Sequence, residues 1–264
     1  MLITAAIAPA LILLWYVYNK DTEPEPTRLI VKGFFLGGLA TFASTVISGP
    51  LLEMDIITQT PADIVEAVGL SFLGAAIPEE CAKLFMLWLL LRNNPYFDEH
   101  YDGIVYAASV GLGFAAFENL LYVISSGAGW FDVAVTRAFF AVPGHFGFAV
   151  AMGYYYSLYH FKGNKAPFGT KWKILLVPVL LHGLYDTICF IGDLTPAIAG
   201  FASIVLIVFC LILFRKTRRR ILSESRQNER PPFKTASEYF DPDENVRTHG
   251  YDINRDWTDR PEDQ

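Results

Sequence analysis

Charge is scarce in this sequence. Asp, Glu, Lys and Arg make up 18% of the 264 residues, whereas a typical soluble domain has about 25%. Much of that charge follows Phe214, and residues 221–264 alone hold 11 acidic and 6 basic side chains. The rest of the chain consists of long apolar runs with short polar breaks, which indicates a membrane protein. No extended basic surface remains that would bind nucleic acid.

Motifs of several common hydrolases and redox proteins are also missing. The three cysteines, Cys81, Cys189 and Cys210, stand singly in apolar runs, and no C-x-x-C pair exists. These features argue against a disulfide framework and against a thiolate zinc site. The chain contains neither the G-x-S-x-G motif of serine hydrolases nor the H-E-x-x-H motif of zinc proteases. A hydrolase activity would therefore need a different set of groups.

About seven apolar runs approach the ~20 residues that a helix needs to cross a bilayer. Helices are the default because every backbone polar group must be satisfied inside lipid. The first run lacks the positive region and clear cleavage site of a signal peptide, so we interpret it as a retained helix. The third run contains Pro78, so we expect it to be tilted, kinked or built from two pieces. The sequence thus predicts an all-α, polytopic transmembrane bundle with spans at Leu2–Tyr18, Leu29–Leu51, Ile64–Leu91, Gly103–Ser125, Val133–Phe161, Lys173–Ile191 and Ala197–Phe214.

Loops that carry Lys or Arg alternate with loops that carry neither. The loops without them are 52–63, 127–132 and 192–196. The basic ones follow the first, third, fifth and last spans, and the last begins with the run RKTRRR at residues 215–220. The positive-inside rule therefore predicts a multi-pass protein of the cell membrane (a bacterial plasma membrane), with its N-terminus outside and its C-terminus in the cytoplasm. From Ile221 onward the tail is polar, and we expect it to be disordered.

Ionisable and amide side chains interrupt four of the predicted spans. An ionisable group at the centre of a membrane helix costs roughly 2.5–3.5 kcal/mol, so a cluster of them favours a function. At about 1.5 Å per residue, the ionisable groups lie about 14–25 Å from the cytoplasmic ends of their spans, in the middle or slightly outer part of the bilayer. The side chains are Glu79, Glu80 and Lys83 in the third span, Glu118 and Asn119 in the fourth, His145 in the fifth, and His182 and Asp186 in the sixth.

Spacing along each helix pairs some of these groups. Glu79 and Lys83 are four residues apart, in the order that favours an ion pair. Glu80 is about 100° further round the helix and can face another neighbour in the same cavity. His182 and Asp186 are also four residues apart, so the carboxylate can orient the imidazole.

This set of groups suits amide hydrolysis, which needs a base for water, an acid for the leaving amine and donors for the oxyanion. Glu79 or Glu80 can act as the base, and a histidine or Asn119 can hold the oxyanion. Phe114, one turn from Glu118, is expected to form a wall of the site. Taken singly, the residues have ordinary explanations as ion pairs, packing histidines or helix contacts. The functional interpretation depends on their occurrence together.

The motifs, in their order along the chain, resemble those of a known family. E-E-x-x-K at residues 79–83, F-x-x-x-E-N at 114–119 and H-x-x-x-D at 182–186 are similar to the motif set of the PrsW family. That family belongs to the superfamily of type II CAAX prenyl proteases and Abi-type membrane proteases. The N-terminal segment, with DTEPEP at residues 21–26, also resembles the family. The resemblance covers roughly residues 1–214, which we predict to be a transmembrane protease domain, and leaves residues 215–264 as a basic juxtamembrane run and an acidic tail.

Two departures separate the sequence from the CAAX branch. Lys83 stands one residue closer to the carboxylates than the arginine of that branch, and Glu118 occupies the position of its second-motif histidine. Both departures favour the PrsW branch. His145 is a candidate to supply the imidazole that is missing from the second motif.

The resemblance implies a glutamate-dependent intramembrane protease without a metal or other cofactor, in which Glu79 and Glu80 are catalytic and His182 assists. It also implies a single-pass membrane protein as substrate, such as an anti-sigma factor cleaved on its extracytoplasmic side. The predicted catalytic residues are Glu79, Glu80, Glu118 and His182, supported by Lys83, Asn119, His145 and Asp186.

Two alternatives stay open at this point. The first is a zinc protease with Glu79, Glu118, His145 and His182 as ligands, since two histidines and carboxylates can hold zinc. The second is a proton-coupled transporter or scaffold, because carboxylate–histidine chains also form proton relays. No internal repeat typical of transporters is present, which gives this alternative less weight.

Overall fold

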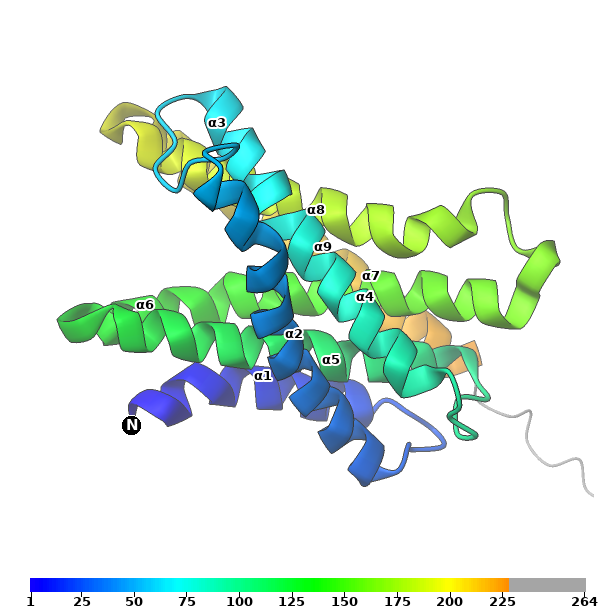
Figure 1. Cartoon of the computed structure of the whole chain (residues 1–264). Coiled ribbons are helices and arrows are strands. Elements are labelled where there is room, and N and C mark those ends of the chain that lie inside the picture. Colours follow the sequence, from blue (N-terminus) through cyan, green and yellow to red (C-terminus); the bar gives the residue numbers. More distant parts are fainter. Residues whose placement is uncertain (228–264) are drawn as a thin grey trace, which may run out of the picture. The chain divides into compact units, whose positions relative to one another are not determined.

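The computed structural model describes residues 1–227, which are helical almost throughout and contain no strand (Figure 1). The predicted all-α bundle is therefore confirmed for this part of the chain. Most of the predicted tail, residues 228–264, lies outside the described residues. The helices are α1 (Leu2–Tyr18), α2 (Thr27–Glu53), α3 (Ile64–Gly69), a π-helical segment (Leu70–Ala76), α4 (Ile77–Leu91), α5 (His100–Ser125), α6 (Trp130–Phe139), α7 (Ala141–Lys162), α8 (Thr170–Leu194) and α9 (Pro196–Gln227), with short 3-10 turns at Gly127–Gly129 and Gly163–Lys165.

Length and apolar composition make this a multi-pass membrane protein. Five helical stretches are long and apolar enough to cross a membrane, namely α2, α5, Gly127–Lys165, α8 and α9. Helix α1 is apolar but shorter. The run from α3 to α4 is not among the five, and it carries Glu66, Glu79, Glu80 and Lys83.

The predicted third span is helical from Ile64 to Leu91 and is built from two α-helical pieces. The π-helical segment Leu70–Ala76 joins α3 to α4, and Pro78 stands in the first turn of α4. Proline lacks a backbone N–H, so a wider turn just before it accommodates the lost hydrogen bond. Glu79 and Glu80 follow immediately in the same first turn.

The predicted fifth span, Val133–Phe161, is wrong as a single helix. Helix α6 ends at Phe139 and α7 begins at Ala141, with a break at Phe140, where φ is −118° and ψ is −61°. Pro143 explains the break, because a proline ring clashes with the carbonyl four residues earlier, which here belongs to Phe139. Helix α6 is thus a separate element, and it contacts α1, α5 and α7.

The last helix is longer than the predicted span, which ended at Phe214. Helix α9 continues through the basic run to Gln227, so the expected disorder from Ile221 is wrong for residues 221–227. Ile221 is fully buried in the main hydrophobic core, which explains why the helix persists. The Ser225 hydroxyl donates to the carbonyl of Lys20, so two of the basic segments lie at the same end of the bundle.

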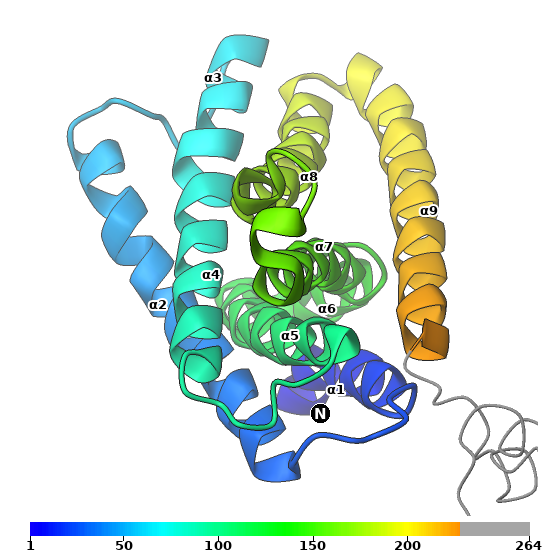
Figure 2. The ribbon, with the colours of Figure 1, turned by 90° about the vertical axis from the view of Figure 1, so that its right-hand side faces the viewer.

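Helix α5 forms the centre of the bundle. Of its most apolar 18 residues, 78% are buried within the protein, against 11% for α9. Figure 2 shows α5 among α1, α2, α4, α6 and α7, with α9 along one side. Close packing of α2 on α5 needs glycine, since a Cβ on Gly37 would lie 1.9 Å from the carbonyl oxygen of Val110.

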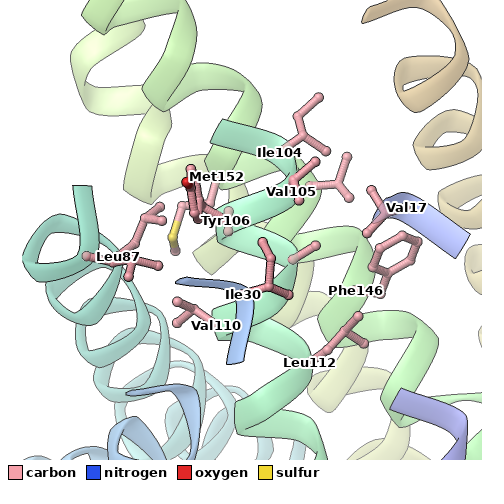
Figure 3. Close-up of a cluster of buried hydrophobic side chains, with 14 of the residues drawn as sticks. Val17, Ile30, Leu87, Ile104, Val105, Tyr106, Val110, Leu112, Phe146 and Met152 are labelled. Carbon is pink, nitrogen blue, oxygen red and sulfur yellow. The ribbon is translucent and has the colours of Figure 1, made fainter. Parts of the chain in front are cut away.

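The main core joins the helices that carry the polar side chains. Val17, Ile30, Leu87, Val110 and Phe146 come from α1, α2, α4, α5 and α7 and are all buried (Figure 3). Burying such side chains fixes the relative positions of their helices. The polar groups on α4, α5 and α7 are therefore held on a rigid frame.

Candidate active site

Lys83 of α4 lies at the centre of a group of polar side chains. Its Nζ donates to Glu80 Oε1 at 2.8 Å and to Glu79 Oε2 at 3.4 Å. The same atom is 3.1 Å from His145 Nδ1, on α7. The ring of Phe114 lies beneath the ammonium at 3.9 Å, so the predicted aromatic wall is present.

His182 of α8 contacts three carboxylates. Its Nδ1 lies 2.9 Å from Glu80 Oε1, and its Nε2 lies 3.2 Å from Asp186 Oδ2 and 3.7 Å from Glu79 Oε2. The predicted contact between His182 and Asp186, one turn apart, is therefore present. The ring of Phe148 stacks on the imidazole at 5.0 Å between centroids and limits its movement.

Glu118 of α5 completes the group. Its Oε2 lies 2.9 Å from His145 Nε2, so the His145 ring links Glu118 on one side to Lys83 on the other. The side chains that the sequence placed at one depth in four spans thus meet in one place. We use the name carboxylate–histidine network for these side chains together with Arg137 of α6, which also contacts Glu118. Its members are Glu79, Glu80, Lys83, Glu118, Arg137, His145, His182 and Asp186.

Arg137 of α6 is a member that the sequence interpretation missed. Its guanidinium donates to Glu118 Oε2, and its Nε donates to Asn119 Oδ1 at 2.9 Å. It also lies 4.0 Å from the centre of the Tyr122 ring. The available signal was a basic residue in the fifth predicted span, since an unpaired charge there would be costly.

Asn119 does not occupy the predicted position of an oxyanion donor. Its side chain is fully buried, its Nδ2 donates to the carbonyl of Ala6 at 2.7 Å, and its Oδ1 accepts from Arg137. The amide is directed toward α1 and α6, where it positions Arg137. The predicted oxyanion role of Asn119 is therefore not supported by this geometry.

Exposure divides the network into two sets. In the inner set, the exposed fraction of the side chain is 0% for Glu80, 3% for Lys83, 5% for His145 and 4% for His182. In the outer set, it is 13% for Glu79, 15% for Glu118, 16% for Arg137 and 17% for Asp186. Glu80 Oε2 is buried and has no hydrogen-bond partner among the described residues. Of the two adjacent glutamates, only Glu79 is reachable from outside.

Comparison with known proteins identifies the family. Residues 25–214 match the model of a family described as "PrsW family intramembrane metalloprotease". The chain belongs to the PrsW family. A comparison with solved structures gives no significant match.

Curated PrsW relatives resemble the chain over most of its length. It is 38% identical over 192 residues to Protease PrsW of Geobacillus kaustophilus, which covers 70% of this chain and 78% of that protein. It is 39% identical over 190 residues to Protease PrsW of Bacillus subtilis, covering 71% and 82%. For Protease PrsW of Oceanobacillus iheyensis the identity is 36% over 213 residues, covering 78% and 87%. Membership of the PrsW family makes the protein a membrane protease that acts on membrane-protein substrates in lipid.

Three network residues of this PrsW member could also hold a metal ion. Glu79, His145 and His182 each offer one ligand atom, and these atoms lie within 4.8 Å of one another. Two histidines and one glutamate are a common ligand set of catalytic zinc. Glu118, the fourth ligand of the zinc alternative, is not part of this group, and its Oε2 contacts Arg137 and His145.

Proposed function

We propose that the protein is an intramembrane endopeptidase in which Glu79 activates the attacking water. The observation that carries this proposal is the difference in exposure between two adjacent glutamates that share the same partners. Glu79 and Glu80 both contact Lys83 and His182, but the side chain of Glu79 is 13% exposed and that of Glu80 is fully buried. A general base must reach the water from which it takes a proton. Glu80 instead fixes Lys83 and His182.

The reaction then proceeds with the groups at hand. Glu79 removes a proton from water, and the oxygen of that water bonds to the carbonyl carbon of the substrate peptide. His182, which Asp186 and Glu80 hold in place, gives a proton to the leaving amine as the C–N bond breaks. Each ring nitrogen of His182 faces a carboxylate, so the ring can receive a proton from Glu79 and pass it on.

The oxyanion needs N–H donors near Glu79. Arg137 is the candidate, because its guanidinium has N–H groups beyond those that donate to Glu118 and Asn119. Donors that are fixed before the reaction stabilise a developing charge without further reorganisation. In this proposal Glu118 and Asn119 orient Arg137, and Asn119 contributes only through it.

A zinc-dependent protease is the second candidate. The family description names a metalloprotease, and Glu79, His145 and His182 fit as ligands. Bound zinc would polarise the substrate carbonyl or lower the pKa of a bound water. In the described structure both ring nitrogens of His145 and of His182 already contact protein groups, among them the Lys83 ammonium. Those contacts support the metal-free version as the first choice.

We further propose a single-pass membrane protein, such as an anti-sigma factor, as the substrate, and a cell-membrane location with the N-terminus outside. The alternation of basic loops supports this orientation. With it, the network lies in the middle or outer part of the bilayer, which suits cleavage on the extracytoplasmic side.

The test compares cells that express the native protein, Glu79→Gln, Glu80→Gln or the exposed control Glu53→Gln. Quantitative analysis of membrane proteins and of their new N-termini should reveal a substrate that is cut by the native and Glu53→Gln proteins. The same substrate should accumulate uncut with either active-site variant. Equal cleavage in all four strains would contradict the proposal.

Metal analysis of the purified native protein decides between the two versions. The metal-free version predicts less than about 0.1 zinc per chain and cleavage that a chelator does not reduce. Stoichiometric zinc that is lost in Glu79→Gln, together with chelator-sensitive cleavage, would establish the zinc version instead.

A further inference from the structure

A second group of carboxylates lies near the other end of α5. Asp21 and Glu25 come from the loop between α1 and α2, and Glu99 and Asp102 come from the start of α5. We call these four residues the acidic cluster. Asp102 precedes Glu118 by 16 residues along α5, which is about 24 Å at about 1.5 Å per residue. The acidic cluster is thus separate from the carboxylate–histidine network.

The acidic cluster is tightly packed and largely buried. The exposed fraction is 9% for Asp21, 4% for Glu25 and 1% for Asp102. One carboxylate oxygen from each of Asp21, Glu99 and Asp102 lies within 4.8 Å of the other two. Buried carboxylates at such distances repel one another unless a proton or a cation lies among them.

Neutral hydrogen-bond donors offset only part of this repulsion. Asp102 Oδ2 accepts from the backbone N–H groups of Asp98 and Glu99, at 3.0 and 2.6 Å. Glu25 accepts from the Tyr106 hydroxyl. Within residues 1–227, none of Asp21, Glu25 and Asp102 forms an ion pair with Lys, Arg or His.

Asp21 supplies the observation that points to a ligand. Its Oδ1 accepts from the backbone N–H of Glu23 at 3.2 Å, whereas its Oδ2 is buried and has no hydrogen-bond partner within residues 1–227. A buried carboxylate that has an unpartnered oxygen and lies beside two other carboxylates is a typical feature of a cation site.

We propose that Asp21, Glu99 and Asp102 bind one divalent cation of the Mg²⁺ or Ca²⁺ class. All three ligands are carboxylate oxygens, and these hard cations prefer such ligands, whereas zinc usually has histidine or cysteine among its ligands. The bound cation connects the α1–α2 loop to the first turn of α5. Since α5 carries Glu118, the cation fixes the helix on which part of the carboxylate–histidine network stands.

The experiment uses the purified full-length protein in detergent, stripped of metal with a chelator and then dialysed. Mn²⁺ is the probe, because its free and bound forms differ in electron paramagnetic resonance. We expect one Mn²⁺ per chain at pH 7.5, displaced by millimolar Mg²⁺ or Ca²⁺. Asp21→Asn and Glu99→Gln should each weaken Mn²⁺ binding at least 10-fold. The matched control Glu23→Gln, exposed in the same loop, should change it less than twofold.

Two further measurements separate this site from the network and from effects on folding. Glu79→Gln should leave the Mn²⁺ affinity unchanged, because Glu79 is a candidate zinc ligand and does not belong to the acidic cluster. Adding Mn²⁺ to the native protein should raise its unfolding temperature, as expected for a ligand that binds the folded state. The proposal would be overturned by an absence of binding and of stabilisation at millimolar Mn²⁺. Binding that survives both Asp21→Asn and Glu99→Gln would overturn it as well. Neither result depends on whether the protein cleaves peptides.

Discussion

The carboxylate–histidine network and the acidic cluster bury similar numbers of carboxylates but differ in what surrounds them. In the network, Glu79, Glu80 and Glu118 have Lys83 and Arg137 as partners within the chain. In the acidic cluster, Asp21, Glu25 and Asp102 have only neutral donors among the described residues. Deep in the bundle, the chain itself supplies the opposite charge. At the end of the bundle, ions from solution can supply it.

This comparison predicts opposite responses to a neutralising substitution. In a buried set of side chains whose positive and negative charges offset one another, removing one charge leaves its partner unpaired, which costs free energy. Removing a charge from an unbalanced group relieves repulsion and stabilises the folded state. The predictions begin with the largest expected effect; those for Lys83 and Asp21 test this contrast in stability, and that for Arg137 tests the network through its activity.

Lys83→Met should strongly destabilise the protein, because it leaves Glu79 and Glu80 together without their shared cation. Removing one partner of a buried ion pair typically costs about 3–5 kcal/mol. Thermal unfolding of the purified protein in detergent measures the effect. Lys173→Met, which removes an exposed lysine from α8, is the matched control and should have little effect. If both variants unfold at the native temperature, Lys83 does not offset the negative charge of Glu79 and Glu80.

Arg137→Gln should reduce cleavage of the natural substrate about 10- to 100-fold, a loss of about 1.4–2.8 kcal/mol in transition-state stabilisation. The variant loses the donor to Glu118 and leaves His145 less well oriented. Arg137→Lys keeps the charge but loses the two-donor geometry, so it should recover only part of the rate. Full activity of Arg137→Gln would show that Arg137 does not contribute to catalysis.

Asp21→Asn should stabilise the protein when a chelator is present, and the effect should grow with pH. Because the pKa of Asp21 is raised from 3.8 to about 6 in the folded state, the stability linked to its protonation is complete below pH about 4 and is lost as pH rises through about 6. The Asn variant avoids that loss. Its advantage over the native protein should increase by about 1.4 kcal/mol between pH 5 and pH 8.

Unfolding temperatures at the two pH values measure this change, with Glu23→Gln as the control. A destabilising effect of Asp21→Asn in the presence of chelator would show that the acidic cluster is not repulsive. With excess Mg²⁺ or Ca²⁺ the sign should reverse, because the native carboxylate then has its cation.

Much of the network could be predicted from the sequence, because depth along a helix and spacing of one turn are local properties. Glu79, Lys83, His182 and Asp186 follow directly from that geometry, and the structure brings them together as expected. His145 was placed correctly because its depth matched that of Glu118. These inferences needed only regular helices in a bilayer.

Arg137 and Asn119 could not be placed in this way. Both depend on the break at Phe140, which makes α6 a separate helix beside α5 and α1. Pro143 was a local signal for that break, but the direction that α6 takes depends on packing against other helices. The acidic cluster was missed for a similar reason, since Asp21 and Asp102 are 81 residues apart and meet only in the folded chain.

The most direct measurement of the central claim is the cleavage rate of purified Glu79→Gln on its natural membrane substrate in proteoliposomes. Loss of a general base typically reduces a rate by about 10²–10⁴-fold. We therefore predict a rate below about 1% of native, with an unfolding temperature close to native and full activity in the Glu53→Gln control. Native-rate cleavage by folded Glu79→Gln would show that peptide hydrolysis does not depend on this carboxylate, and the proposed role of the network would be wrong.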